Sequence, residues 1–136
     1  MTQKDKDLLL QDLSARLPYG VKGVVTFHKN MTETREEVRI IDGKLYDRFA
    51  KFQDSWYDNV TIKPYLFPLS SMTDEQKEEF NSYFASVPYY GDNEQEHVVP
   101  YYFVELLIEF FHENHIDNNG LIPMGLAIDA TGLNIY

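Results

Sequence analysis

Three glutamates at four-residue intervals, Glu105, Glu109 and Glu113, are the feature of the sequence best suited to chemistry. Four residues make about one helical turn, so on a helix these carboxylates form a stripe along one face. Tyr101 and Tyr102 stand beside the stripe and would add stacking or apolar contact. Such a stripe is typical of a solvated polar face, of a contact surface whose carboxylates imitate nucleic-acid phosphates for a basic partner, or of part of a metal site.

The metal interpretation depends on Glu109 and His112, which form a Glu-x-x-His pair. Carboxylate di-metal bundles use this pair twice, whereas the chain holds it once. His112 and His115 are three residues apart, so they do not complete a zinc-binding His-Glu-x-x-His motif. The helix dipole favours histidines at a helix C-terminus without ligation. We therefore expect no metal ligand and no cofactor, and keep a metal-dependent or carboxylate-based enzyme using Glu109 and His112 as an alternative.

Other catalytic signatures are missing from the sequence. The chain has no cysteine, which excludes a thiol nucleophile, a disulfide framework and a cysteine-bound metal. It also lacks a phosphate-binding Gly-x-x-x-x-Gly-Lys-Ser/Thr loop, a Gly-x-Gly-x-x-Gly turn and a Gly-x-Ser-x-Gly elbow. We predict no catalytic residue and favour a non-enzymatic role.

Charge is distributed unevenly along the chain. All 12 lysines and arginines lie at or before Lys77, while ten of the 22 acidic residues follow it, and the net charge is −10. Nucleic-acid affinity comes from cations that neutralise phosphates, so direct nucleic-acid binding is disfavoured. The acidic half favours a basic protein partner.

No segment resembles a secretion signal or a membrane span. Residues 1–7 alternate in charge, and the three leucines that follow are too few for a signal peptide. The apolar runs 98–111 and 121–128 fall short of the roughly 20 residues of a membrane helix. We expect a cytoplasmic protein without membrane contact.

Periodicity and capping signals predict the elements that position the stripe. Helices are expected from Thr2 to residue 17, from the capping box at Thr73 to residue 87, and over residues 100–114, with Pro100 in the first turn. Strands are expected over 21–28, 37–41 and 60–67, with a last strand at 126–128, and Gly23 indicates a bulge or a close approach. For 44–59 we predict a short strand followed by a loop or helical turn, because Asp42 and Gly43 suit a hairpin.

The third predicted helix is apolar over about 200° of its circumference, which is typical of a central core helix. Together these elements predict a single α+β domain over residues 1–136, with three helices packed on a small antiparallel sheet of three or four strands.

Three stretches, residues 7–20, 63–73 and 120–127, resemble an uncharacterised family of small proteins encoded by phages and prophages of gut anaerobic bacteria. The family has no known activity, so the resemblance implies a mobile-element context. Members of that family often carry basic residues where Phe67 and Asn119 stand in this chain.

We therefore expect an acidic interaction module that binds a basic protein partner through Glu105, Glu109 and Glu113, with contributions from Tyr101 and Tyr102. Its sharper form is a DNA mimic that occupies a host nuclease or regulator. A structural or assembly component is a further alternative, and the sequence does not fix the oligomeric state.

Overall fold

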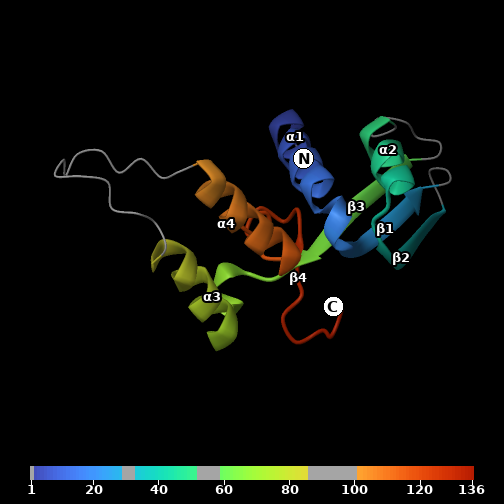
Figure 1. The fold of residues 1–136 in the computed structure, drawn as a ribbon. Coiled ribbons are helices and arrows are strands. Elements are labelled where there is room, and N and C mark those ends of the chain that lie inside the picture. The colour runs from blue at the N-terminus through green and yellow to red at the C-terminus, as the bar shows by residue number, and fades with distance from the viewer. Residues whose placement is uncertain (1, 29–32, 52–58, 86–100) are drawn as a thin grey trace.

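A computed structural model describes residues 2–28, 33–51, 59–85 and 101–136 (Figure 1). Within these ranges the α-helices are α1 (Gln3–Arg16), α2 (Gly43–Lys51), α3 (Asp74–Ala85) and α4 (Tyr101–Glu113), and the strands are β1 (Lys22–His28), β2 (Thr34–Ile40), β3 (Asn59–Leu66) and β4 (Ile128–Asp129). Short 3-10 turns, η1 (Leu17–Tyr19) and η2 (Leu69–Ser71), follow α1 and β3. The α+β class is confirmed.

The four strands form one sheet in the order β2-β1-β3-β4. β1 pairs antiparallel with both β2 and β3, whereas β3 pairs with β4 in parallel. The prediction of a purely antiparallel sheet is therefore wrong, because the chain passes through α3 and α4 before the last strand returns beside β3. The close approach predicted at Gly23 is confirmed, since a Cβ there would lie 2.7 Å from the carbonyl oxygen of Lys63.

The segment after β2 is a helix, so the predictions of a short strand there and of three helices are both wrong. Asp42 does not begin a hairpin; its Oδ1 accepts the backbone N–H of Leu45 at 2.8 Å and caps α2. Leu45 and Phe49 then lie four residues apart on the buried side of that helix. The rest of the ambiguous segment, residues 52–58, lies outside the described residues.

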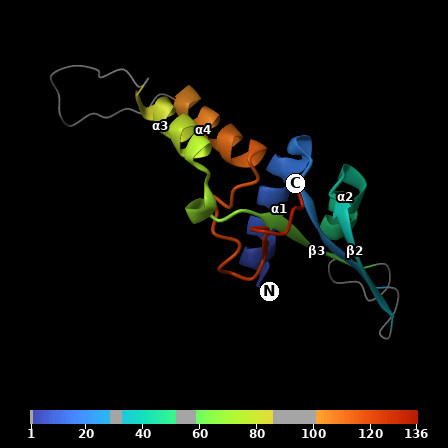
Figure 2. The ribbon, with the colours of Figure 1, turned by 90° about the horizontal axis from the view of Figure 1, so that it is seen from below.

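The hydrophobic core lies between the sheet and the helices α1 and α2. Leu9 and Leu13 of α1 and Phe49 of α2 meet Val25 and Ile62 of the sheet there. α3 and α4 lie side by side away from this layer (Figures 1 and 2). Among the described residues no helix combines the length and apolar character that crossing a bilayer requires.

Candidate functional site

The predicted carboxylates all lie at the surface of α4. Glu105, Glu109 and Glu113 are exposed, and Glu79 of the adjacent helix α3 is exposed as well. These four residues are called the acidic face below. The Tyr83 phenol of α3 interacts with three of these carboxylates. Burial, a hydrogen bond to Glu79, and the charges of Glu79, Glu113 and Glu109 together raise its pKa. Carboxylates of two helices thus share one electrostatic field.

Aromatic packing pairs the two helices that carry the acidic face. The Phe80 ring of α3 lies 6.0 Å from Phe110 and 5.9 Å from Phe111 of α4, between ring centroids. The capping box at the start of α3 is confirmed, since the Thr73 hydroxyl accepts the N–H of Gln76 at 3.1 Å and the Gln76 side chain accepts the N–H of Thr73 at 3.0 Å. Gln76 also donates to Asn114 at 3.1 Å and fixes α3 to the end of α4.

α4 is not the central core helix that its composition predicts. Phe110 and His112 near its C-terminal end are buried, but Val104, Leu106 and Ile108 are 41%, 39% and 41% exposed. The described part of this helix is buried mainly in its last turns, so Val104, Leu106 and Ile108 remain at the surface. These apolar side chains and the glutamates together make the surface of α4 both acidic and apolar.

The remaining predicted site residues are the two tyrosines at the start of α4 and the Glu109–His112 pair. Tyr101 and Tyr102 lie in the first turn of α4, and their side chains fall outside those described. Glu109 and His112 are not brought together: Glu109 is exposed, whereas the His112 ring is buried 6.1 Å from the Tyr19 ring. Within the described ranges, no group of three or more histidines and carboxylates is arranged to hold a metal ion.

A buried polar cluster that the sequence analysis missed ties α1 to the segment after α4. Arg16 is 0% exposed, and its Nε donates to Asp12 at 2.8 Å. Its Nη2 donates to the carbonyl oxygen of Ile116 at 2.7 Å and to Oδ1 of Asn118 at 2.8 Å. Asn119 donates to Asp12 at 2.9 Å. These five residues are called the Arg16 cluster below.

The Arg16 cluster stabilises the fold and is not a reactive site, because the guanidinium has no surface accessible to solvent. Its Nη1 has no hydrogen-bond partner within the part of the chain that the structure describes. Burial and the Arg16 charge lower the pKa of His112, with a smaller opposing effect from Asp12. The only sign of this cluster in the sequence is that Asp12 and Arg16 stand four residues apart on a helix. Surface ion pairs have the same spacing, so the sequence does not show that this pair is buried.

Tyr136 closes a gap between β1 and β3. Its hydroxyl accepts the N–H of Lys22 at 2.8 Å and donates to the carbonyl of Tyr65 at 2.7 Å, at the position where the β1–β3 ladder ends. The ring stacks on His115 with 3.6 Å between centroids and 9° between planes. Burial is the main cause that raises the pKa of Tyr136 to about 12.

Replacing Tyr136 with phenylalanine should lower the free energy of unfolding by about 1–2 kcal/mol, since the Lys22 N–H and the Tyr65 carbonyl lose their shared partner. Urea denaturation measures the change. The matched control is Tyr46→Phe, because the Tyr46 hydroxyl has no hydrogen-bond partner among the described residues, and it should change stability by less than about 0.5 kcal/mol. Equal losses in the two variants would contradict the bridging role of Tyr136.

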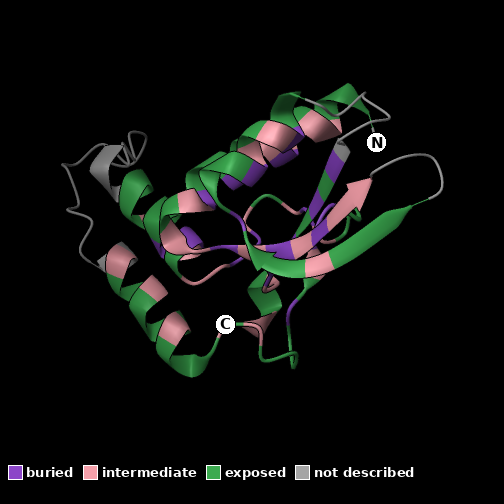
Figure 3. Ribbon diagram, turned by 90° about the vertical axis from the view of Figure 1, so that its right-hand side faces the viewer, coloured by how far each residue is buried: buried purple, intermediate pink, exposed green. Residues whose placement is uncertain are grey.

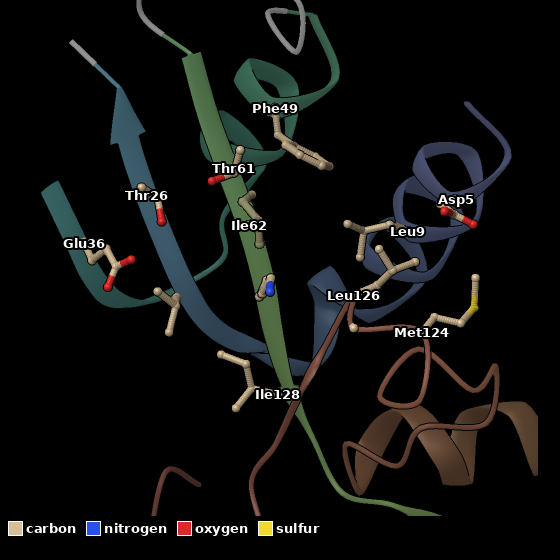
Figure 4. Close-up of a pocket in the computed structure, with 13 residues that line it drawn as sticks. Asp5, Leu9, Thr26, Glu36, Phe49, Thr61, Ile62, Met124, Leu126 and Ile128 are labelled. Atoms are coloured by element: carbon tan, nitrogen blue, oxygen red, sulfur yellow. The ribbon is translucent and has the colours of Figure 1, made fainter. Parts of the chain in front are cut away.

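A cavity of about 720 Å³ runs along β3. Figure 4 places Thr26 and Glu36 on one side of this strand and Leu9, Leu126 and Met124 on the other. Its carboxylates, Asp5 and Glu36, lie at opposite ends, and Asp5 already accepts the N–H of Thr2 at 3.2 Å. The cavity therefore does not bring its two carboxylates together.

The two histidines at the C-terminal end of α4, His112 and His115, are not the dipole-stabilised cations that their position predicts. Burial, together with the charges of Arg16 and Lys22, lowers the pKa of His115 to about 4. The pKa of His112 is lowered as well. Both rings are therefore neutral at pH 7 and belong to the packing of the C-terminal segment.

Comparisons extend the search for function beyond the chain itself. No protein-family description, no curated protein and no solved structure matches this chain. No relative therefore indicates an activity or a partner, and the functional conclusion rests on the geometry of the chain itself.

Proposed function

We propose that this protein is a non-enzymatic interaction module that binds a basic protein partner through the acidic face. The observation that carries the proposal is the exposure of Glu105, Glu109 and Glu113 on one helix, next to Glu79 of its neighbour. From Glu78 onward the sequence contains no lysine or arginine to neutralise them. The negative electrostatic potential of this face can thus attract a protein surface rich in lysine and arginine.

The apolar residues of α4 define the partner further. Exposed Val104 and Ile108 would be covered by an apolar area, while lysines and arginines around that area would meet the glutamates. Interfaces combine an apolar centre with a charged rim in this way, and opposite potentials speed the encounter. A basic groove built for nucleic acid has this chemistry, and the resemblance to phage-encoded proteins supports the sharper form, a DNA mimic.

The test is affinity capture from bacterial lysate with the tagged protein and with the triple variant Glu105→Gln, Glu109→Gln, Glu113→Gln. We expect the protein, but not the variant, to retain a basic protein, and high salt to release it. The purified partner should then bind the variant at least about tenfold more weakly in calorimetry. DNA should compete with the protein if the partner uses a nucleic-acid groove.

The matched control removes the same number of charges elsewhere, by Asp7→Asn, Glu36→Gln and Asp47→Asn. These residues are exposed and lie on α1, β2 and α2. The control should bind like the unmodified protein. Equal binding by all three proteins, or equal weakening by both variants, would overturn the proposal, since net charge rather than the acidic face would then govern retention.

A further inference from the structure

β2 is an edge strand, and none of the described strands pairs with its outer side. It stands at the end of the sheet order and pairs only with β1 among the described strands (Figure 1). Six of its seven residues are exposed, as the green strand in Figure 3 shows. It contains no proline and no lysine, two residues with which natural edge strands prevent pairing with other chains.

The register identifies the backbone groups that face outward. The N–H of Ile41 donates to the carbonyl of Val21 at 2.8 Å, continuing the β1–β2 ladder. Hydrogen-bonded pairs alternate along an antiparallel ladder, so the odd-numbered residues of β2 bond to β1. The even-numbered residues, Thr34, Glu36, Val38 and Ile40, therefore turn their N–H and C=O groups away from the sheet.

Apolar side chains accompany this open edge. Val38 and Ile40 are 57% and 58% exposed. They lie on the sheet face opposite the core, where Val38 is the cross-strand neighbour of Val24. A partner strand that pairs with β2 would cover both side chains and satisfy the open backbone groups at the same time.

We propose that the partner is a second copy of this chain, paired antiparallel through β2 about a twofold axis at Val38. In this register Glu37 of each copy faces Arg39 of the other, in the non-hydrogen-bonded pairs where side chains are closest. Arg39 is exposed and has no ion-pair partner among the described residues. Glu37 contacts Arg35 of its own strand through Oε1 at 3.0 Å.

The same strand excludes the two neighbouring registers and the next one. An axis at Glu37 would set Glu37 against Glu37 and Arg35 against Arg39. An axis at Arg39 would set Arg39 against Arg39, and one at Glu36 would set Glu36 against Glu36. Like charges that are directly opposite are destabilising, so only the axis at Val38 combines ion pairs in both directions with apolar contact at the centre.

The other described helices and strands leave this edge accessible. α2 follows directly after β2 but packs over β3 and against α1, away from the outer side of β2. Pairing would join the two sheets into one continuous sheet. Because a strand-to-strand contact buries less area than a standard protein interface, we expect a dissociation constant on the order of micromolar.

Sedimentation velocity across the micromolar range tests the dimer with charge-reversal variants. Arg39→Glu and Glu37→Arg should each be monomeric, because each replaces both ion pairs with like-charge pairs. An equimolar mixture of these two variants should dimerise, since each glutamate then faces an arginine. Recovery in the mixture also shows that both variants are folded.

Two further variants complete the design. Val38→Lys places like charges on the axis and should weaken dimerisation by about tenfold or more. Lys44→Glu reverses an exposed charge on α2 and should dimerise like the unmodified protein. A monomeric unmodified protein, a mixture that stays monomeric, or equal effects of Lys44→Glu and Arg39→Glu would each overturn the proposal. Stronger dimerisation of Arg39→Glu would overturn it too, by placing the axis at Glu37.

Discussion

Replacing Asp12 with alanine should lower the free energy of unfolding by about 3–5 kcal/mol, because the substitution leaves the fully buried Arg16 charge without its counter-ion. The two side chains meet at 2.8 Å with no exposed surface on either. Asn119 loses its acceptor in the same step. Urea denaturation measures the loss, and the same experiment on Asp7→Ala is the control.

Asp7 lies on the same helix, is exposed, and among the described residues accepts a hydrogen bond from Gln3 alone. Its removal should cost less than about 0.5 kcal/mol. A double variant, Asp12→Leu with Arg16→Met, should recover much of the loss, because apolar residues of similar volume can replace a buried ion pair. A loss for Asp12→Ala no larger than that for Asp7→Ala would contradict the structural role of the Arg16 cluster.

Acidification should destabilise the protein through His115. The pKa of His115 is lowered to about 4 from its ordinary value of 6.5, so the unfolded chain binds a proton at a higher pH than the folded one. The associated stability is fully present above pH 6.5 and is lost as the pH falls to about 4. The expected loss is about 2–3 kcal/mol, since one pKa unit corresponds to about 1.4 kcal/mol.

His115→Asn isolates this contribution. The residue has a φ of +56°, a conformation that asparagine accepts, and asparagine does not titrate. The difference in unfolding free energy between the unmodified protein and this variant should shrink by about 2–3 kcal/mol between pH 6.5 and pH 4. His112 titrates in both proteins and cancels from the difference. A difference that stays constant with pH would show that the folded protein does not disfavour the His115 cation.

Local signals in the sequence predicted much of the fold because they act over a few residues. The Thr2 cap and the leucines of α1, the capping box at Thr73 and the alternation in β1 each produced the expected element. At residues 42–51 two local signals competed, and the helical spacing of Leu45 and Phe49 outweighed the turn chemistry of Asp42 and Gly43 because it buries two large side chains.

The candidate site was predictable only in part. The exposure of Glu105, Glu109 and Glu113 followed from their spacing on an apolar helix. The environment of that helix did not follow, because composition cannot tell which apolar residues become buried: Phe110 is buried, whereas Val104 and Ile108 are exposed. The Arg16 cluster and the Tyr136 bridge depend on contacts between distant parts of the chain, which no local pattern encodes.

The Arg16 cluster has a consequence for the order of folding. Arg16 and Asp12 are separated by 100 to 107 residues from their partners at Ile116, Asn118 and Asn119, and Tyr136 reaches back 114 residues to Lys22. Contacts this distant along the chain slow folding, because a long loop must close before they form. During synthesis Arg16 and Asp12 therefore lack their final partners until residues 116–119 have left the ribosome, and until then the Arg16 charge is exposed to solvent and to chaperones.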